Sequence, residues 1–199
     1  MNIETLRAVL RSPDAVKEKP FEVLKTIACL VGSPEQELIA HEMVLRALEQ
    51  RHCFGPYLEI LYSLVRSVGL FPYLEPDTLG FRDIVAYELH RPENMGDDFV
   101  FHREQAEIYR RLLNGDSVIL SAPTSFGKSR IIDAIIATGR FRNVAVIVPT
   151  LALIDETRRR LTQFSARYKI VSHLSQQPGE SNIFIFTAER AVAYGRFLP

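Results

Sequence analysis

Apolar residues recur at intervals of three and four along the first ninety positions. The spacing is clear from Ile3 to Leu10 and again through Val23, Ile27 and Leu30. It places the apolar side chains on one face of a helix, so it predicts a series of amphipathic helices joined by turns. Proline and glycine residues break the pattern. We expect helices over about 3–10, 21–30, 34–52, 57–68 and 78–90.

The period changes after a polar, Pro- and Gly-containing stretch at 91–98. Apolar runs at 117–120, 144–148, 169–172 and 183–186 now alternate with helical patterns at 104–113, 130–138 and 151–164. Strands that alternate with helices predict a parallel α/β sheet, and the unbroken β-branched run at 144–148 predicts a strand buried on both faces. The expected fold class is α/β: an all-helical domain over 1–92, a linker over 93–100 and part of an α/β domain over 101–199.

The charge balance differs between the two halves of the chain. Residues 1–95 carry 10 Lys and Arg against 14 Asp and Glu, whereas residues 96–199 carry 14 against 10. Twelve of those 14 cations are arginines, whose planar guanidinium can bind two phosphate oxygens at once. The second half therefore favours nucleic acid as a partner, although the excess is small.

No apolar run approaches the roughly 18 residues that a membrane-spanning helix needs. The N-terminus also lacks the basic flank and apolar core of a signal peptide. We therefore expect a soluble cytoplasmic protein with no membrane partner. Cys29 and Cys53 lie in apolar helical patterns, so we expect two buried thiols and neither a disulfide nor a metal pair.

One stretch carries recognisable chemistry. Residues 122–129 read Ala122, Pro123, Thr124, Ser125, Phe126, Gly127, Lys128 and Ser129, between a predicted strand and a predicted helix. They follow the phosphate-loop pattern GxxxxGK[ST], except that Ala122 replaces the first glycine. Gly127 would allow close backbone approach, Lys128 would reach the β- and γ-phosphates, and Ser129 would bind Mg²⁺. The alternative is an ordinary strand-to-helix turn with an exposed lysine.

Three other stretches accompany this loop in a fixed order. Gln105 lies 23 positions before Lys128, the segment that begins Pro149-Thr150 follows one predicted strand, and Thr187-Ala188-Glu189-Arg190 follows another. Together with residues 122–129, they resemble the first RecA-like domain of superfamily 2 helicases of the DEAD/DEAH-box group. The resemblance implies that ATP and Mg²⁺ bind at 122–129 and that Gln105 reads adenine. It also implies that Pro149, Thr150, Thr187, Glu189 and Arg190 contact the phosphates of a nucleic acid strand.

The same residues have plainer interpretations when each is taken alone. An amide side chain can pair with adenine, but Gln105 taken alone is more typical of a solvent-facing helix residue. Thr150 and Thr187 each follow a strand, where a hydroxyl can cap a helix or face a phosphate. The run Arg158-Arg159-Arg160 is more typical of a solvated helix face than of a clamp on nucleic acid.

The sequence departs from the family pattern at Ser125, where glycine is usual, and at Asp155-Glu156, where glutamine is common. It reaches Pro199 without an acidic motif II. We therefore expect the N-terminal piece of a longer protein, one that hydrolyses no ATP at a useful rate by itself.

The predicted function is the ATP-binding portion of an ATP-dependent helicase or translocase, with Lys128 in the catalytic machinery. Its partner would be single-stranded DNA or RNA, bound without sequence preference, and a protein partner would dock on the helical domain. Two alternatives stay open: a P-loop ATPase that acts on a protein partner, and a non-catalytic, truncated interaction module.

Overall fold

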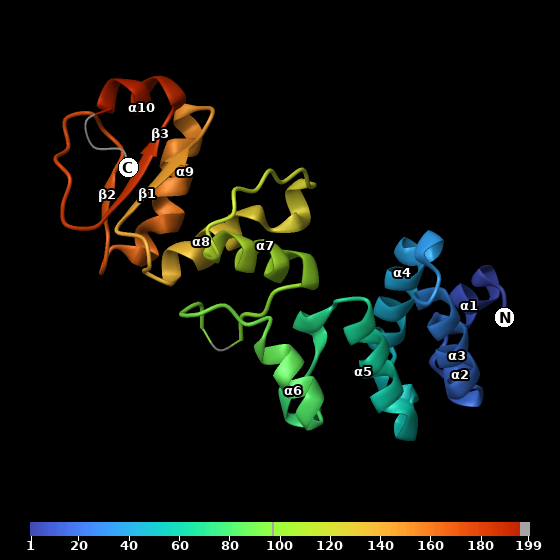
Figure 1. Ribbon diagram of the computed structural model, residues 1–199. Coiled ribbons are helices and arrows are strands. Elements are labelled where there is room, and N and C mark those ends of the chain that lie inside the picture. The colour runs from blue at the N-terminus through green and yellow to red at the C-terminus, as the bar shows by residue number, and fades with distance from the viewer. Residues whose placement is uncertain (97, 196–199) are drawn as a thin grey trace. The chain divides into compact units, whose positions relative to one another are not determined.

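The computed structural model describes residues 1–96 and 98–195 (Figure 1). Among these residues the chain forms two compact units, the first from residues 1–91 and 98–106 and the second from residues 92–96 and 107–195. The division falls within α7 (Arg103–Leu113). Asp97 of the predicted linker and residues 196–199 of the predicted α/β domain lie outside the described residues.

The first unit is helical, as the spacing of its apolar residues predicts. Its helices begin where the sequence offers caps: the Asn2 side chain accepts a hydrogen bond from Thr5 N at 2.8 Å, and Pro13 and Pro20 occupy first-turn positions. Short 3-10 turns follow several helices, so the expected helix over 34–52 is divided and the one over 78–90 is shorter. The helices are α1 (Ile3–Leu10), α2 (Pro13–Glu18), α3 (Pro20–Val31), α4 (Glu37–Glu49), α5 (Leu58–Ser67) and α6 (Phe81–Glu88).

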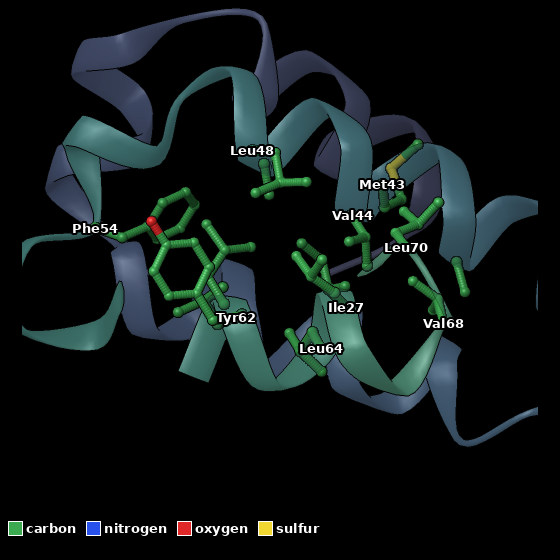
Figure 2. Packing of buried hydrophobic residues seen from close by; sticks show 14 of the residues in the cluster. Ile27, Met43, Val44, Leu48, Phe54, Tyr62, Leu64, Val68 and Leu70 are labelled. Carbon is green, nitrogen blue, oxygen red and sulfur yellow. The ribbon is translucent and has the colours of Figure 1, made fainter. Parts of the chain in front are cut away.

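The apolar faces of these helices form one core. Figure 2 shows Met43, Val44 and Leu48 of α4 gathered with Ile27 of α3 and with side chains of α5. Several of these side chains, including Ile27, Met43 and Val44, are fully shielded from solvent. Burial of each such side chain contributes about 1.5–3 kcal/mol, which is the main term that holds small helices together.

A glycine lets the start of α7 pack against the end of α5. Gly69 has a φ of 78°, and its carbonyl accepts a hydrogen bond from Arg103 N at 3.2 Å. The Arg103 guanidinium then donates to the carbonyls of Arg66 and Ser67, at 2.8 and 2.9 Å. These carbonyls belong to the last turn of α5, where a cation is favoured by the helix dipole.

The second unit contains a three-stranded parallel sheet in the order β1-β3-β2. The strands are β1 (Asn143–Ile147), β2 (Lys169–Val171) and β3 (Asn182–Phe186), and Ile147 pairs with Phe186 in the register of β1 and β3. The helices of this part are α8 (Lys128–Ala137), α9 (Leu151–Leu161) and α10 (Ala188–Tyr194), with 3-10 turns at Thr124–Phe126 and Thr162–Phe164. The predicted α/β class is confirmed.

Helices cover both faces of the central strand, β3. Ile183 and Ile185 lie in a cluster with Ile136 of α8 and with Ile154 and Leu161 of α9. The alternate residues, Phe184 and Phe186, pack with Ala191 and Tyr194 of α10. Because successive strand residues point to opposite faces, α8 and α9 share one face of β3 and α10 covers the other; α9 and α10 are seen beside the strands in Figure 1.

Two predictions about strands are wrong. The structure has no strand over 117–120, and Ile119 is fully exposed. The run at 144–148 does form β1, but β1 lies at an edge of the described sheet, with Ala145 and Ile147 exposed, whereas all five residues of β3 are buried. An apolar run indicates which residues favour a strand, but the neighbours that would cover the strand come from elsewhere in the chain.

One of the two thiols also differs from expectation. Cys53 is buried, but Cys29 is exposed. Both are free cysteines. In the part of the chain that the structure describes, no helix is long and apolar enough to cross a bilayer.

We expect Gly69→Ala to destabilise the first unit. An added Cβ at this position would lie 2.7 Å from Arg103 Cβ, and the positive φ is unfavourable for alanine. Urea denaturation should show a loss of about 2–3 kcal/mol, because strain and displacement of Arg103 add together.

The matched control is Gly55→Ala. Gly55 also has a positive φ, 47°, but no atom lies within 4 Å of an added Cβ. This variant should lose only the conformational part, about 1 kcal/mol. Equal losses in the two variants would contradict the packing role assigned to Gly69.

Candidate nucleotide-binding site

The loop at 122–129 makes one tight turn before α8. A 3-10 turn at Thr124–Phe126 leads to Gly127, which has φ 80° and ψ 30° and directly precedes the first residue of α8. Backbone that passes from a helical to a left-handed residue turns successive N–H groups to the same side. At a helix N-terminus, such a concave group of amides binds phosphate oxygens. Only glycine adopts this conformation readily, which explains why Gly127 is the residue at this turn.

Lys128 folds back over the loop. Its Nζ donates hydrogen bonds to the Ala122 and Pro123 carbonyls, at 2.6 and 2.8 Å. The ammonium group is therefore held at the mouth of the turn by neutral acceptors rather than by a carboxylate. Carbonyl partners leave its positive charge uncompensated, so the charge remains available to an anion.

Ser129 is exposed in the first turn of α8, next to Lys128. A serine hydroxyl at this place is a ligand that Mg²⁺ accepts. The left-handed turn, the ammonium group and this hydroxyl fit the phosphates and metal of a nucleotide. The structure therefore brings together the predicted residues 122–129.

A pair of charged residues that the sequence did not reveal lies behind this turn. Asp133 of α8 forms an ion pair with Arg160 of α9, and its side chain is only 2% exposed. Arg160 Nη1 also donates to the Ser129 carbonyl at 3.2 Å. The prediction that Arg158-Arg159-Arg160 forms a solvated face is thus wrong for Arg160.

A signal for this pair was present in the sequence. Asp133 is a charged residue within an otherwise apolar helical pattern, and a buried carboxylate requires a cationic partner. The partner is 27 positions away, so local spacing could not identify it.

Positive charge surrounds the start of α8. Burial lowers the pKa of Arg160, and repulsion from Arg130 lowers it further. Arg130 and Lys128 lie in the same first turn of α8. Three cations thus lie at the loop end of α8, one of them paired with Asp133, and this charge favours an anion there.

The helices α9 and α10 begin at the same end of the sheet, just after β1 and β3 finish. Thr150 caps α9 by accepting a hydrogen bond from Leu153 N at 3.3 Å, and Thr187 caps α10 by accepting one from Arg190 N at 3.5 Å. Since β1 and β3 are parallel and Ile147 pairs with Phe186, the two caps lie at the same end of neighbouring strands. The capping interpretation of both threonines is therefore observed. Pro149 is exposed beside Thr150.

The acidic and basic residues after Thr187 have separate contacts. The pKa of Glu189 is lowered because its carboxylate accepts a hydrogen bond from its own backbone N–H and another from the Thr187 hydroxyl. Arg190 Nη1 donates to the Ser172 carbonyl at 3.4 Å. A carboxylate repels phosphate, so Arg190 has the charge that suits a nucleic acid backbone.

Gln105 belongs to the first unit, whereas residues 122–129 belong to the second. Its side-chain oxygen accepts a hydrogen bond from His102 N at 3.0 Å. This is the back-bond of a capping box, in which the third residue of a helix satisfies the amide that precedes it. The structure thus gives Gln105 a local role at the start of α7.

Comparisons with known proteins divide the chain in two. Residues 1–84 match the family model described as the N-terminal domain of anti-bacteriophage protein B, and residues 102–193 match that of the DEAD/DEAH box helicase. All the predicted site residues lie within the second match. No solved structure matches the chain.

One curated relative is similar over most of the chain. Anti-bacteriophage protein B of Escherichia coli (strain K12) is 38% identical over 174 residues, which cover 85% of this chain and 24% of the relative. The chain therefore spans about a quarter of the length of the relative that it matches.

Proposed function

We propose that this chain is the ATP-binding portion of an ATP-dependent helicase or translocase that acts on nucleic acid. The observation that carries the proposal is the left-handed turn at Gly127, which opens α8, together with the Lys128 ammonium group held on the Ala122 and Pro123 carbonyls. The match of residues 102–193 to a DEAD/DEAH box helicase supports it.

The residues of the loop have distinct tasks in this proposal. The backbone N–H groups at the turn around Gly127 bind phosphate oxygens, and Lys128 exchanges its two carbonyl partners for the β- and γ-phosphates. Ser129 supplies a hydroxyl to Mg²⁺, which neutralises phosphate charge when it is bound. Gln105 reads adenine in this proposal, since an amide side chain carries both a donor group and an acceptor group.

The nucleic acid strand, in this proposal, binds at the end of the sheet where α9 and α10 begin. Pro149 and Thr150 present an exposed turn at the first helix, and Arg190 brings a cation to the second. Glu189 helps to hold the start of α10, because its carboxylate accepts a hydrogen bond from the Thr187 hydroxyl. Contacts with phosphates carry no sequence information, so binding should be nearly independent of sequence.

The relative's name gives the proposal a biological setting. A protein called anti-bacteriophage protein B shares 38% identity with this chain, and its N-terminal domain model matches residues 1–84. We include in the proposal that the whole protein acts in defence against bacteriophages. The first unit would then be the part that docks a protein partner.

Lys128→Ala tests the nucleotide site. The variant should bind a fluorescent ATP analogue with Mg²⁺ about 10–100-fold more weakly, because it lacks a charge-assisted contact worth about 1.5–3 kcal/mol. Its free energy of unfolding should change by less than about 1 kcal/mol, since little packing is lost.

The control is Lys169→Ala, which removes an exposed lysine of β2 from the same unit. It should bind the analogue as the parent does. A Lys128→Ala variant with the parent's affinity would show that the loop does not bind the triphosphate.

Arg190→Gln tests the proposed contact with a nucleic acid strand. Fluorescence anisotropy with single-stranded oligonucleotides should show parent affinities that fall linearly with salt on a double-logarithmic plot. The variant should bind every sequence more weakly to a similar degree, with a salt slope smaller by about 1.

The control here is Arg140→Gln, which removes an exposed arginine that pairs with Glu93 in the same unit. Its binding and slope should equal those of the parent. If the parent bound no oligonucleotide, an ATPase that acts on protein would become the better interpretation.

A further inference from the structure

The ion pair between Asp133 and Arg160 joins two helices of the second unit. Asp133 lies on α8, and Arg160 lies one residue before the end of α9. The carboxylate is 2% exposed and the guanidinium 29% exposed. Burial of two charges costs so much that apolar residues of similar size often stabilise a fold equally well. Stability alone therefore does not account for this pair.

A second hydrogen bond of Arg160 links the ion pair to the first turn of α8. The same guanidinium nitrogen that pairs with Asp133 also donates to the Ser129 carbonyl at 3.2 Å. Ser129 and Asp133 are four positions apart, so they lie on one face of α8. Arg160 therefore fastens the first turn of α8, which carries Lys128 and Ser129, to α9.

The other end of α9 lies at the proposed strand-binding edge. The helix begins after the Thr150 cap and continues without a break to Leu161. Ile154 and Leu161 anchor it against β3, while Arg160 is directed to α8. A turn of helix held from outside in this way keeps its side chains within the narrow geometry that metal ligation demands.

We propose that Arg160 is a positioning residue for the metal-bound nucleotide: through Asp133 and the Ser129 carbonyl, it fixes the turn that presents the Ser129 hydroxyl to Mg²⁺. This inference rests on the proposed function. Partners of a metal ligand in the surrounding shell commonly affect metal affinity 10–100-fold. The role should therefore be visible in the dependence of nucleotide affinity on Mg²⁺.

The experiment compares the affinity of the 199-residue chain for a fluorescent ATP analogue in excess Mg²⁺ with its affinity in EDTA. The ratio of the two affinities is the readout, because a residue that is merely structural would weaken both. Arg160→Met should reduce the ratio about 10-fold, with a small change in EDTA. Arg160→Lys keeps a cation beside Asp133 and should restore part of the ratio.

Arg160→Met alone leaves a buried carboxylate without its partner and could fail to fold. The decisive variant is therefore the double substitution Asp133→Leu with Arg160→Met, which removes both charges and retains the volume. It should fold as well as the parent and still show a reduced ratio. Arg158→Met is the matched control, since Arg158 lies on the same helix, is half-exposed and pairs with Asp155 on α9 itself.

The outcomes distinguish a failure of the role given to Arg160 from a failure of the proposed function. A double variant that folds and keeps the parent's Mg²⁺ ratio overturns the role of Arg160 and leaves the proposed function intact. A reduction of equal size in Arg158→Met overturns it as well. A parent chain that binds no nucleotide in either condition overturns the proposed function and, with it, this inference.

Discussion

The left-handed backbone at Gly127 is the constraint on which the candidate site depends. At φ 80° and ψ 30°, this residue turns the chain into α8 and places Lys128 and Ser129 in the first helical turn. A side chain with a Cβ would be strained in this conformation. The position of the ammonium group over the Ala122 and Pro123 carbonyls follows from the same turn.

The rest of the second unit holds this turn in place. Ile136 of α8 packs beneath β3 together with residues of α9, while the loop end of the helix carries the charges. One end of α8 is thus anchored by apolar burial and the other by the ion pair with Arg160. This division is suited to a site that exchanges ligands: the scaffold is fixed by packing, and the functional groups lie at its margin.

Sequence reasoning succeeded where the signal was local. The strands β1 and β3, the helices around them and the composition of residues 122–129 follow from period and motif, which involve neighbours in the chain. It failed where the answer depended on distant residues. Ile119 lies in an apolar run that predicts a strand, yet no described strand pairs with it, and the partner of Asp133 is on another helix.

Gln105 has one contact that is observed and another that is predicted. Its predicted contact with adenine came from a resemblance, whereas its observed hydrogen bond with His102 N follows from the ordinary chemistry of a helix start. The observed hydrogen bond concerns the side-chain oxygen, and the contact with adenine stays a prediction for experiment. The caps at Thr150 and Thr187 likewise combine a local role that is observed with a strand-binding role that is proposed.

Amide hydrogen exchange of the 199-residue chain, with and without saturating ATP and Mg²⁺, tests the central claim most directly. The account predicts slower exchange in peptides that cover residues 122–130, because their N–H groups would bind phosphate oxygens. Peptides within residues 1–84 should serve as an internal reference and change little. Exchange at 122–130 that stays the same at saturating nucleotide would contradict the account.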